Sequence, residues 1–415
     1  MRQIVEIARE NLRKSALAMS QSKLPAVGAR WGTYSDQIRA LANSTNDPLM
    51  VIRTAQEWQG SFESRHTTDA LAGYAADLDA LILREFPEFA TNLASFAESD
   101  TAPADKVAFR NGRKVSSPVL SQTRTVLRGI KTARPKVVLD IGGGTGSTGR
   151  LWMTNTVHNP RRYIDLDLPE SLFFAEVYLR HALPDADVIY LHSAIDLLRC
   201  AIPSTRKQVV LVPAHKHHLA RWLGADLVTN TGSLQEMTTE YVDHYMRIIE
   251  ECGARYFYSS NYFAQKIEVL VESMNYAAPT LPSHWKARNL VWWPDEFRGV
   301  AEVVYERTES ADDDIHDFGL TPKDQSEFLH LFDALRHTSD ANEIIDAVKR
   351  TKAALPYVPK ETLYLARRAK SLSPDDASIA ACVSELEALA AIGVANFGMI
   401  GEAPPKLDLV PHDLS

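Results

Sequence analysis

The sequence has 415 residues, a length that predicts two or three domains. Hydrophobic residues make up 45% and charged residues 24%, a balance that excludes collagen-like, coiled-coil and wholly disordered chains. The 45 basic and 53 acidic side chains give a formal net charge of −8, and no long basic block occurs. The electrostatic footprint of a nucleic-acid binder is therefore missing, and we expect a small-molecule partner instead.

Cysteine usage and hydropathy point to a protein of a reducing compartment. Cys200, Cys252 and Cys382 are odd in number and far apart, which argues against a disulfide framework or a cysteine-rich zinc site. Charged residues interrupt the first 20 residues, and no stretch approaches the roughly 18 apolar residues of a membrane span. We expect a cytoplasmic protein without a membrane segment.

The first part of the chain, residues 1–112, is predicted to be a helical domain. Apolar residues recur at helical spacing within 4–16 (Ile4, Ile7, Ala8, Leu12 and Ala16) and again within 70–82. The polar, proline-containing stretch 97–106 then predicts a loop or linker.

The middle part, residues 113–310, alternates strands with helices. Short β-rich runs lie at 136–141, 162–167, 187–192, 208–213, 226–231 and 255–260. Helical stretches at 170–183 and 234–252 separate some of them, a pattern that predicts a mostly parallel sheet with helices on both faces. Two later runs, 290–293 and 301–307, are candidates for an antiparallel edge.

The last part, residues 318–415, is predicted to be helical, after an acidic loop at 309–317. Residues 359–389 have the texture of one tetratricopeptide-like helical hairpin. Because repeat arrays need about three copies, we interpret this region as an appendage for packing or for forming a homodimer.

The strongest signal is the segment VVLDIGGGTGSTGR, residues 137–150, in which a β-rich run with Asp140 precedes a series of glycines. A strand that turns abruptly into a helix close to a ligand needs residues without Cβ, so a nucleotide-type cofactor is implied. Gly144, Gly146 and Gly149 fit the dinucleotide pattern GxGxxG. Gly142, Gly144 and Gly146 fit the GxGxG pattern of S-adenosylmethionine enzymes, and the spacing alone does not choose between them.

Two carboxylates favour S-adenosylmethionine. Asp140, directly before the glycines, would repel a pyrophosphate but suits the cationic amino group of the methionine moiety. Asp167 lies 167 − 140 = 27 residues further on, at the end of the next predicted strand, where it can accept hydrogen bonds from both ribose hydroxyls. The structural alternative for Asp167 is that it caps the helix starting near Pro169.

These residues carry a family resemblance. VLDIGGGTG followed by DLDLPES resembles class I S-adenosylmethionine-dependent methyltransferases. The segments 164–188, 211–237 and 255–261, with 109–120 upstream, are together similar to the sugar O-methyltransferase family. The resemblance covers roughly residues 105–265. It implies a Rossmann-like domain, S-adenosylmethionine as cofactor, O-methylation of a small polar acceptor, and Asn230 in the vicinity of the sulfonium.

Methyl transfer is an in-line displacement, so the protein has to align the acceptor oxygen and assist loss of its proton. Glu236 follows the predicted strand 226–231 and is the candidate base, in a place where related O-methyltransferases carry a His-Asp pair. The alternative is that Ser233 and Glu236 form a capping box for the helix that follows. His192 and His215, each after a predicted strand, are the next candidates, since an imidazole titrates near neutrality.

Three points stay open at this stage. The strand whose loop contacts the adenine is either 187–192 or 208–213. The cluster HKHH at 215–218 is read as a solvated loop and not as a metal site, because adjacent histidines point in different directions. An N-methyltransferase, a nicotinamide-dependent oxidoreductase and a non-catalytic interaction protein remain the alternative functions.

Overall fold

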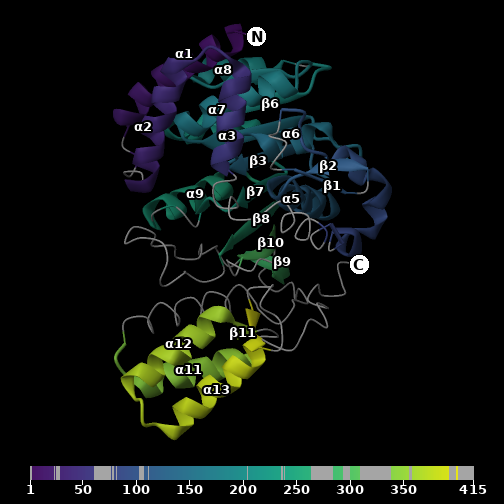
Figure 1. Ribbon diagram of the computed structural model, residues 1–415. Helices are drawn as coiled ribbons and strands as arrows, with labels where there is room; N and C mark the ends of the chain where they lie inside the picture. Colours follow the sequence, from purple (N-terminus) through teal and green to yellow (C-terminus); the bar gives the residue numbers. More distant parts are fainter. Residues whose placement is uncertain are drawn as a thin grey trace. The chain divides into compact units, whose positions relative to one another are not determined.

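The computed structural model describes residues 2–22, 24, 29–59, 76, 79–80, 82–101, 107–110, 112–202, 204–234, 237, 239–262, 284–292, 300–308, 338–354, 358–391 and 399–400 (Figure 1). The chain divides into two compact units. The first unit comprises Met1–Thr231 with Arg247–Ala254, and the second comprises Gly232–Met246 with Arg255–Ser415. Among the described helices, none combines the length and apolar composition needed to cross a membrane.

The N-terminal helices belong to the first unit, where all three lie against helix α7 (Pro169–Ala182) (Figure 1). Their bounds are α1 (Arg2–Ser20), α2 (Ala29–Ser44) and α3 (Pro48–Gln59). The helical prediction for 4–16 is confirmed, and most of the predicted apolar stripe faces inward. Ala8 and Leu12 are buried and Ile4 and Ala16 are half-buried, whereas Ile7 is 39% exposed and Val5 is buried in its place. Most of the predicted helix 70–82 lies outside the described residues.

Five parallel strands form the core of the first unit and lie side by side in the order β5-β6-β4-β3-β7. Their bounds are β3 (Val137–Ile141), β4 (Arg162–Asp167), β5 (Asp187–Tyr190), β6 (Gln208–Pro213) and β7 (Leu227–Thr231). β3 and β6 are buried along their whole length, which explains why both are apolar except for Asp140 and Gln208. From β3 the chain proceeds outward through β4, and it returns to the other side of β3 as β7.

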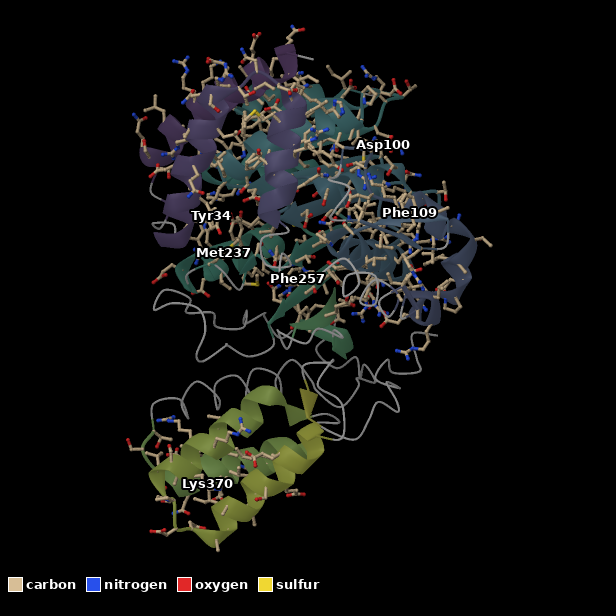
Figure 2. All side chains as sticks on the ribbon, viewed as in Figure 1. Tyr34, Asp100, Phe109, Met237, Phe257 and Lys370 are labelled. Carbon is tan, nitrogen blue, oxygen red and sulfur yellow. The ribbon has the colours of Figure 1, made fainter. Side chains whose placement is uncertain are left out.

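Helices connect these strands. The connecting and flanking elements of the first unit are η2 (Pro87–Ser95), β1 (Ala108–Arg110), β2 (Arg113–Val115), α5 (Ser117–Ala133), α6 (Ser147–Thr154), α7 (Pro169–Ala182), α8 (Ala194–Ala201) and η4 (Ala214–Leu223). β1 and β2 form an antiparallel hairpin on which Phe109 is 78% exposed (Figure 2). The predicted helix 170–183 is confirmed as α7. Strands and helices therefore form the predicted Rossmann-like α/β fold.

The second unit contributes three strands in the order β8-β10-β9: β8 (Tyr256–Tyr262), β9 (Trp285–Trp292) and β10 (Val300–Arg307). β10 is antiparallel to both neighbours, so the predicted antiparallel pairing of the two later runs is confirmed. Phe257 on β8 is buried and stacks against Tyr305 of β10, with ring centroids 5.8 Å apart (Figure 2).

The C-terminal helices of the second unit are α11 (Ala341–Ala354), α12 (Lys360–Leu372) and α13 (Ala377–Ala391), and α12 packs against both of the others. Asp376 begins α13 by accepting hydrogen bonds from the backbone N–H groups of Ser378 and Ile379. The predicted hairpin at 359–389 is confirmed as α12 and α13. A short antiparallel pair, β11 (Val358–Pro359) and β12 (Met399–Ile400), completes the described part.

The helix predicted at 234–252 is shorter than expected. α9 spans Thr239–Glu251 and ends before Gly253, whose φ of 68° lies in the left-handed region that favours glycine. Since α9 begins at Thr239, Ser233 is not its N-cap, and the predicted capping box does not open this helix.

Candidate functional site

The predicted site residues of the first unit gather at the carboxyl ends of its parallel strands. The glycine loop follows β3, Asp167 ends β4, Asn230 lies near the end of β7, and His192 and His215 follow β5 and β6. In open α/β folds this edge binds ligands, at the point where the chain reverses the order of its strands. Here that point is β3, which is flanked by β4 on one side and β7 on the other.

The glycine loop adopts a backbone that other residues would not tolerate. Gly142, Gly144 and Gly146 have φ values of 74°, 64° and 84°, all in the left-handed region. The Gly142 N–H donates to the Leu166 carbonyl over 2.9 Å, which extends the β3–β4 pairing by one residue. Gly146 is the N-cap of α6, so the loop delivers the chain directly into a helix.

Asn230 fixes the strand end that precedes this loop. Its side chain is fully buried, and Nδ2 donates to the Ile141 carbonyl over 2.7 Å. This hydrogen bond links β7 to the last residue of β3. Asn230 therefore has a structural role at the start of the loop that does not depend on a ligand.

Asp140 is bonded inside the protein. It is 3% exposed; Oδ2 accepts a hydrogen bond from the Tyr163 hydroxyl over 2.7 Å and Oδ1 from the Thr229 hydroxyl over 2.8 Å. Burial raises the pKa of Asp140 to about 6, against the lowering effect of the two hydroxyl donors.

Asp167 holds the loop from the neighbouring strand. Its Oδ2 accepts a hydrogen bond from the Gly144 N–H over 2.9 Å, and Oδ1 accepts one from the Leu168 N–H over 2.6 Å. Burial raises the pKa of Asp167 to about 7, partly offset by these two backbone donors. Asp167 thus binds both the glycine loop and the residue that precedes α7.

Asp165, two residues before Asp167 on the same face of β4, is a further site residue that the sequence pattern did not single out. It lies opposite Asp140 in the β3–β4 register and is fully buried. Its Oδ1 accepts a hydrogen bond from the Gly143 N–H over 3.2 Å, while Oδ2 has no partner in the described part of the chain. Burial, with the neighbouring Asp167 and Asp140, raises its pKa well above the usual range. The signal in the sequence was the alternation of Asp165 and Asp167.

Asp140, Asp165 and Asp167 form a group that we call the acid cluster. Within the described residues, no lysine, arginine or histidine forms an ion pair with any of the three. Buried acids without a cation keep their protons or bind a cationic ligand, because burying an unpaired charge is costly. The described residues include no group of three or more His, Cys, Asp or Glu side chains placed to hold a metal ion.

His192 is held by the N-terminal helix α1. Asn11 donates from Nδ2 to both carboxylate oxygens of Glu176, each over 3.0 Å, so its Oδ1 is left to accept from His192 Nε2 over 2.8 Å. His192 therefore carries its proton on Nε2, and burial lowers its pKa. A neutral ring in this tautomer presents Nδ1 as an acceptor.

His215 follows β6, which is the third strand when the parallel strands are counted outward from β3 through β4. β6 pairs directly with β4, whereas β5 lies outside β6, so the loop after β6 is the one that lies beside the glycine loop and Asp167. Burial lowers the pKa of His215 to about 4. Its Nδ1 and the hydroxyl oxygen of Thr231, at the end of β7, are buried without a partner among the described residues.

Glu236, the candidate base, lies outside the described residues, and so does Gln235. The structure therefore places the candidate cofactor-binding residues and the two histidines at the same ends of the strands. The role of Glu236 as a base stays a prediction.

Comparisons with known proteins return solved structures only. No family model and no curated protein matches the chain. The methyltransferase domain of a bacterial CtHen1 is 14% identical and covers 44% of this chain and 95% of its own, with a TM-score of 0.28. Phosphoethanolamine N-methyltransferase 1 from Haemonchus contortus is 11% identical, covers 54% of this chain and 51% of its own, and has a TM-score of 0.28.

A protein from Nostoc punctiforme assigned as an O-methyltransferase is 13% identical, covers 57% of this chain and 73% of its own, and has a TM-score of 0.26. Scores this low do not by themselves establish a common fold. The Rossmann-like fold of this chain rests on its own strand order and register.

Proposed function

We propose that the protein is an S-adenosylmethionine-dependent O-methyltransferase that acts on a hydroxyl group of a small polar acceptor, such as a sugar or a natural-product intermediate. The observation that carries this proposal is the acid cluster beside the glycine loop. Two buried carboxyl groups, Asp140 and Asp165, and the half-buried Asp167 have no basic partner in the described residues, so they favour a cationic ligand and disfavour the pyrophosphate of a dinucleotide. The sequence resemblance supports O-methylation and the class of acceptor.

The residues present fit this cofactor. Asp167 supplies the carboxylate for the ribose hydroxyls, and the unpartnered atoms His215 Nδ1, Thr231 Oγ1 and Asp165 Oδ2 supply further polar groups at the same edge of the strands. S-adenosylmethionine, when bound, supplies an electrophilic methyl group next to a sulfonium. Asp140 and the loop glycines would hold the methionine end, with Asn230 supporting the loop near the sulfonium.

The remaining task of the chain is to remove the acceptor proton. Glu236 is the proposed base, and His192 and His215 are the alternatives. Both histidines have lowered pKa values because they are partly buried, so both are neutral near pH 7 and able to accept a proton.

Calorimetric titration with S-adenosylhomocysteine, with NAD in a parallel experiment, tests the cofactor. We expect saturable binding of the first and none of the second. Asp167→Ala should abolish binding, because it removes the ribose acceptor and the anchor of the Gly144 N–H. Because burial holds the pKa of Asp167 at about 7, affinity should also fall when the pH is lowered from about 8 to about 6.

Asp185→Ala, at an exposed acid outside the site, is the matched control and should bind normally. Binding of NAD, or equal binding by wild type and Asp167→Ala, would contradict the proposal.

Glu236→Gln should bind S-adenosylhomocysteine normally and lose turnover once an acceptor has been found. Equal loss of binding in Asp167→Ala and Glu236→Gln would overturn the division of roles.

A further inference from the structure

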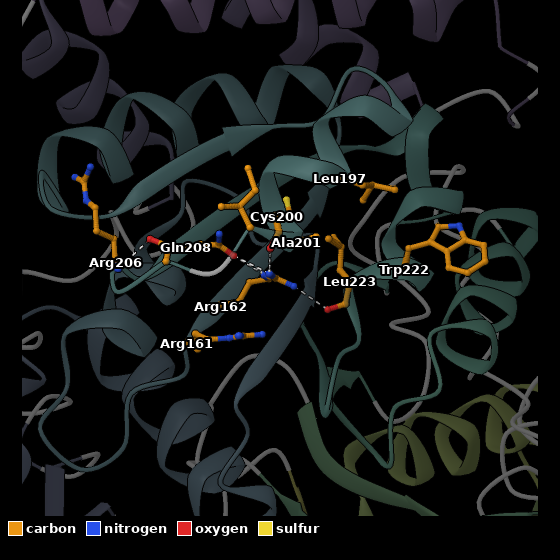
Figure 3. A pocket seen from close by; sticks show the side chains of 11 residues that line it. Arg161, Arg162, Leu197, Cys200, Ala201, Arg206, Gln208, Trp222 and Leu223 are labelled. Carbon is orange, nitrogen blue, oxygen red and sulfur yellow. Dashed lines mark hydrogen bonds between the residues drawn. The ribbon is translucent and has the colours of Figure 1, made fainter.

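A cavity lies at the amino ends of the parallel strands, opposite the carboxyl ends that carry the glycine loop. It has a volume of about 220 Å³ and is lined at the amino ends of β4 and β6 by Arg161, Arg162 and Gln208 (Figure 3). The end of α8 and the end of η4 complete its wall. None of the proposed cofactor or catalytic residues lines it.

Arg162 forms the floor of this cavity and is 7% exposed. Its Nε and Nη2 donate to Gln208 Oε1 over 2.9 and 2.7 Å, Nη2 also donates to the Cys200 carbonyl over 2.5 Å, and Nη1 donates to the Leu223 carbonyl over 3.1 Å. These bonds use four of the five N–H groups of a guanidinium. The fifth, on Nη1, has no partner among the described residues, and all three acceptor oxygens are neutral, so no carboxylate balances this buried charge.

Two further arginines line the same cavity. Arg161 is exposed and forms no ion pair within the described residues. Arg206 contacts Asp187 over 3.1 Å and is therefore already balanced. The cavity thus holds two cationic side chains, Arg161 and Arg162, in excess of the acids around them, in a chain whose overall charge is −8.

The rim of the cavity is apolar. The side chains of Trp222 and Ile202 are 67% and 62% exposed, although large apolar side chains usually gain free energy from burial. Trp222 offers a flat indole surface on which a ring can pack. In Figure 3 it lies on the side of the cavity toward Leu223, whose carbonyl receives the hydrogen bond from Arg162 Nη1.

We propose that this cavity binds a small molecule in which a carboxylate or phosphate group is attached to an apolar ring. The anionic group would accept hydrogen bonds from the fifth N–H of Arg162 and from Arg161, and the ring would pack on Trp222 and Ile202. A volume near 220 Å³ lies below the roughly 300 Å³ at which pockets for drug-sized ligands begin, which limits the ligand to a single ring. This site is independent of the proposed methyl transfer.

Calorimetric titration of the full-length protein with phenyl phosphate, phenylacetate and benzyl alcohol tests the proposal. The first two probes carry the two anionic groups on one ring, and the third carries the ring without a charge. We expect saturable binding of at least one anion and none of benzyl alcohol, and the stronger anion identifies the acid that the site prefers. Arg161→Gln should weaken this binding at least about fivefold, since it removes a charge-assisted hydrogen bond.

Arg199→Gln is the matched control. Arg199 is an exposed arginine on α8 that does not line the cavity, so its replacement should leave the affinity unchanged. Thermal unfolding of both variants checks that each is folded. The proposal is overturned if neither anion reaches saturation at about 10 mM, if benzyl alcohol binds as tightly as the anions, or if both arginine variants lose the same affinity.

Discussion

Asp140 is a carboxyl group that the fold buries between three strands without an ionic partner in the described residues. The two hydroxyl donors, Tyr163 and Thr229, satisfy its oxygens, but they lower its pKa less than burial raises it. The ionisation of Asp140 therefore costs free energy of folding.

This cost predicts a pH dependence of stability. The unfolded chain releases the Asp140 proton near pH 3.8 and the folded protein near pH 6, so raising the pH through that interval favours the unfolded state. Relative to Asp140→Asn, the wild type should lose on the order of 2–3 kcal/mol of unfolding free energy between these pH values. Urea unfolding of both proteins at pH 4, 5, 6 and 7 measures the difference, and parallel curves would show that the carboxyl group ionises freely in the folded state.

The sequence predicts part of this site because part of it is encoded locally. The glycines follow β3 and Asp167 ends β4. These two strands are consecutive in the chain and also pair directly with each other. Asp165 and Thr229 could not be predicted in the same way, because the contact of Asp165 with the Gly143 N–H and that of Thr229 with Asp140 depend on the register of three parallel strands. Asn11 contacts Glu176 across 165 positions of the chain, a distance at which no local pattern exists.

Helix α6 shows why a glycine can matter inside a helix. A Cβ on Gly149 would lie 2.4 Å from the Tyr163 ring, so the close approach of α6 to β4 requires a hydrogen at this position. In the sequence, Gly149 was one of the glycines of the dinucleotide pattern. Packing explains this residue without any ligand, and because the third glycine of GxGxxG also serves helix–strand packing, Gly149 does not discriminate between the two patterns.

Replacing glycine by alanine in two helices separates packing from helix propensity. Gly149→Ala in α6 should destabilise the protein by about 1–3 kcal/mol, because the Tyr163 ring has to move. Gly32→Ala in α2 meets nothing within 4 Å and should stabilise it by about 0.5–1 kcal/mol. Chemical denaturation measures both; a stabilising Gly149→Ala would mean that α6 and β4 do not approach this closely.

At the scale of the elements, hydrophobic runs predicted the strands well, but not their order. The runs at 187–192 and 208–213 have similar composition, and only the hydrogen bonds between β6 and β4 place one of them next to the centre. A parallel strand carries no signal in its own sequence that identifies its neighbour. The exposure of Ile7 on α1 could not be predicted for the same reason, since the edge of the buried face depends on how α1 packs against α7.

At the scale of the first unit, the predicted domain boundary at residue 112 crosses a buried cluster of charges. Glu85, from the N-terminal part, accepts hydrogen bonds from Arg124 over 2.8 and 2.6 Å and from Arg128 over 2.9 Å, both on α5. All three side chains are at most 6% exposed. The N-terminal helices and the parallel strands are joined by this cluster as well as by the packing of α1 on α7.

This arrangement predicts that the chain from residue 113 onward does not fold independently. A chain shortened to begin at residue 113 loses Glu85 and leaves Arg124 and Arg128 without that carboxylate, at a cost of about 3–5 kcal/mol, before the exposed face of α7 is counted. We expect no cooperative thermal transition by circular dichroism. Glu85→Gln in the full-length chain isolates the charge and should lower the unfolding temperature while keeping the transition cooperative. If the shortened chain melted cooperatively near the temperature of the full-length protein, residues 113 onward would be an independent domain and the N-terminal helices a separable attachment.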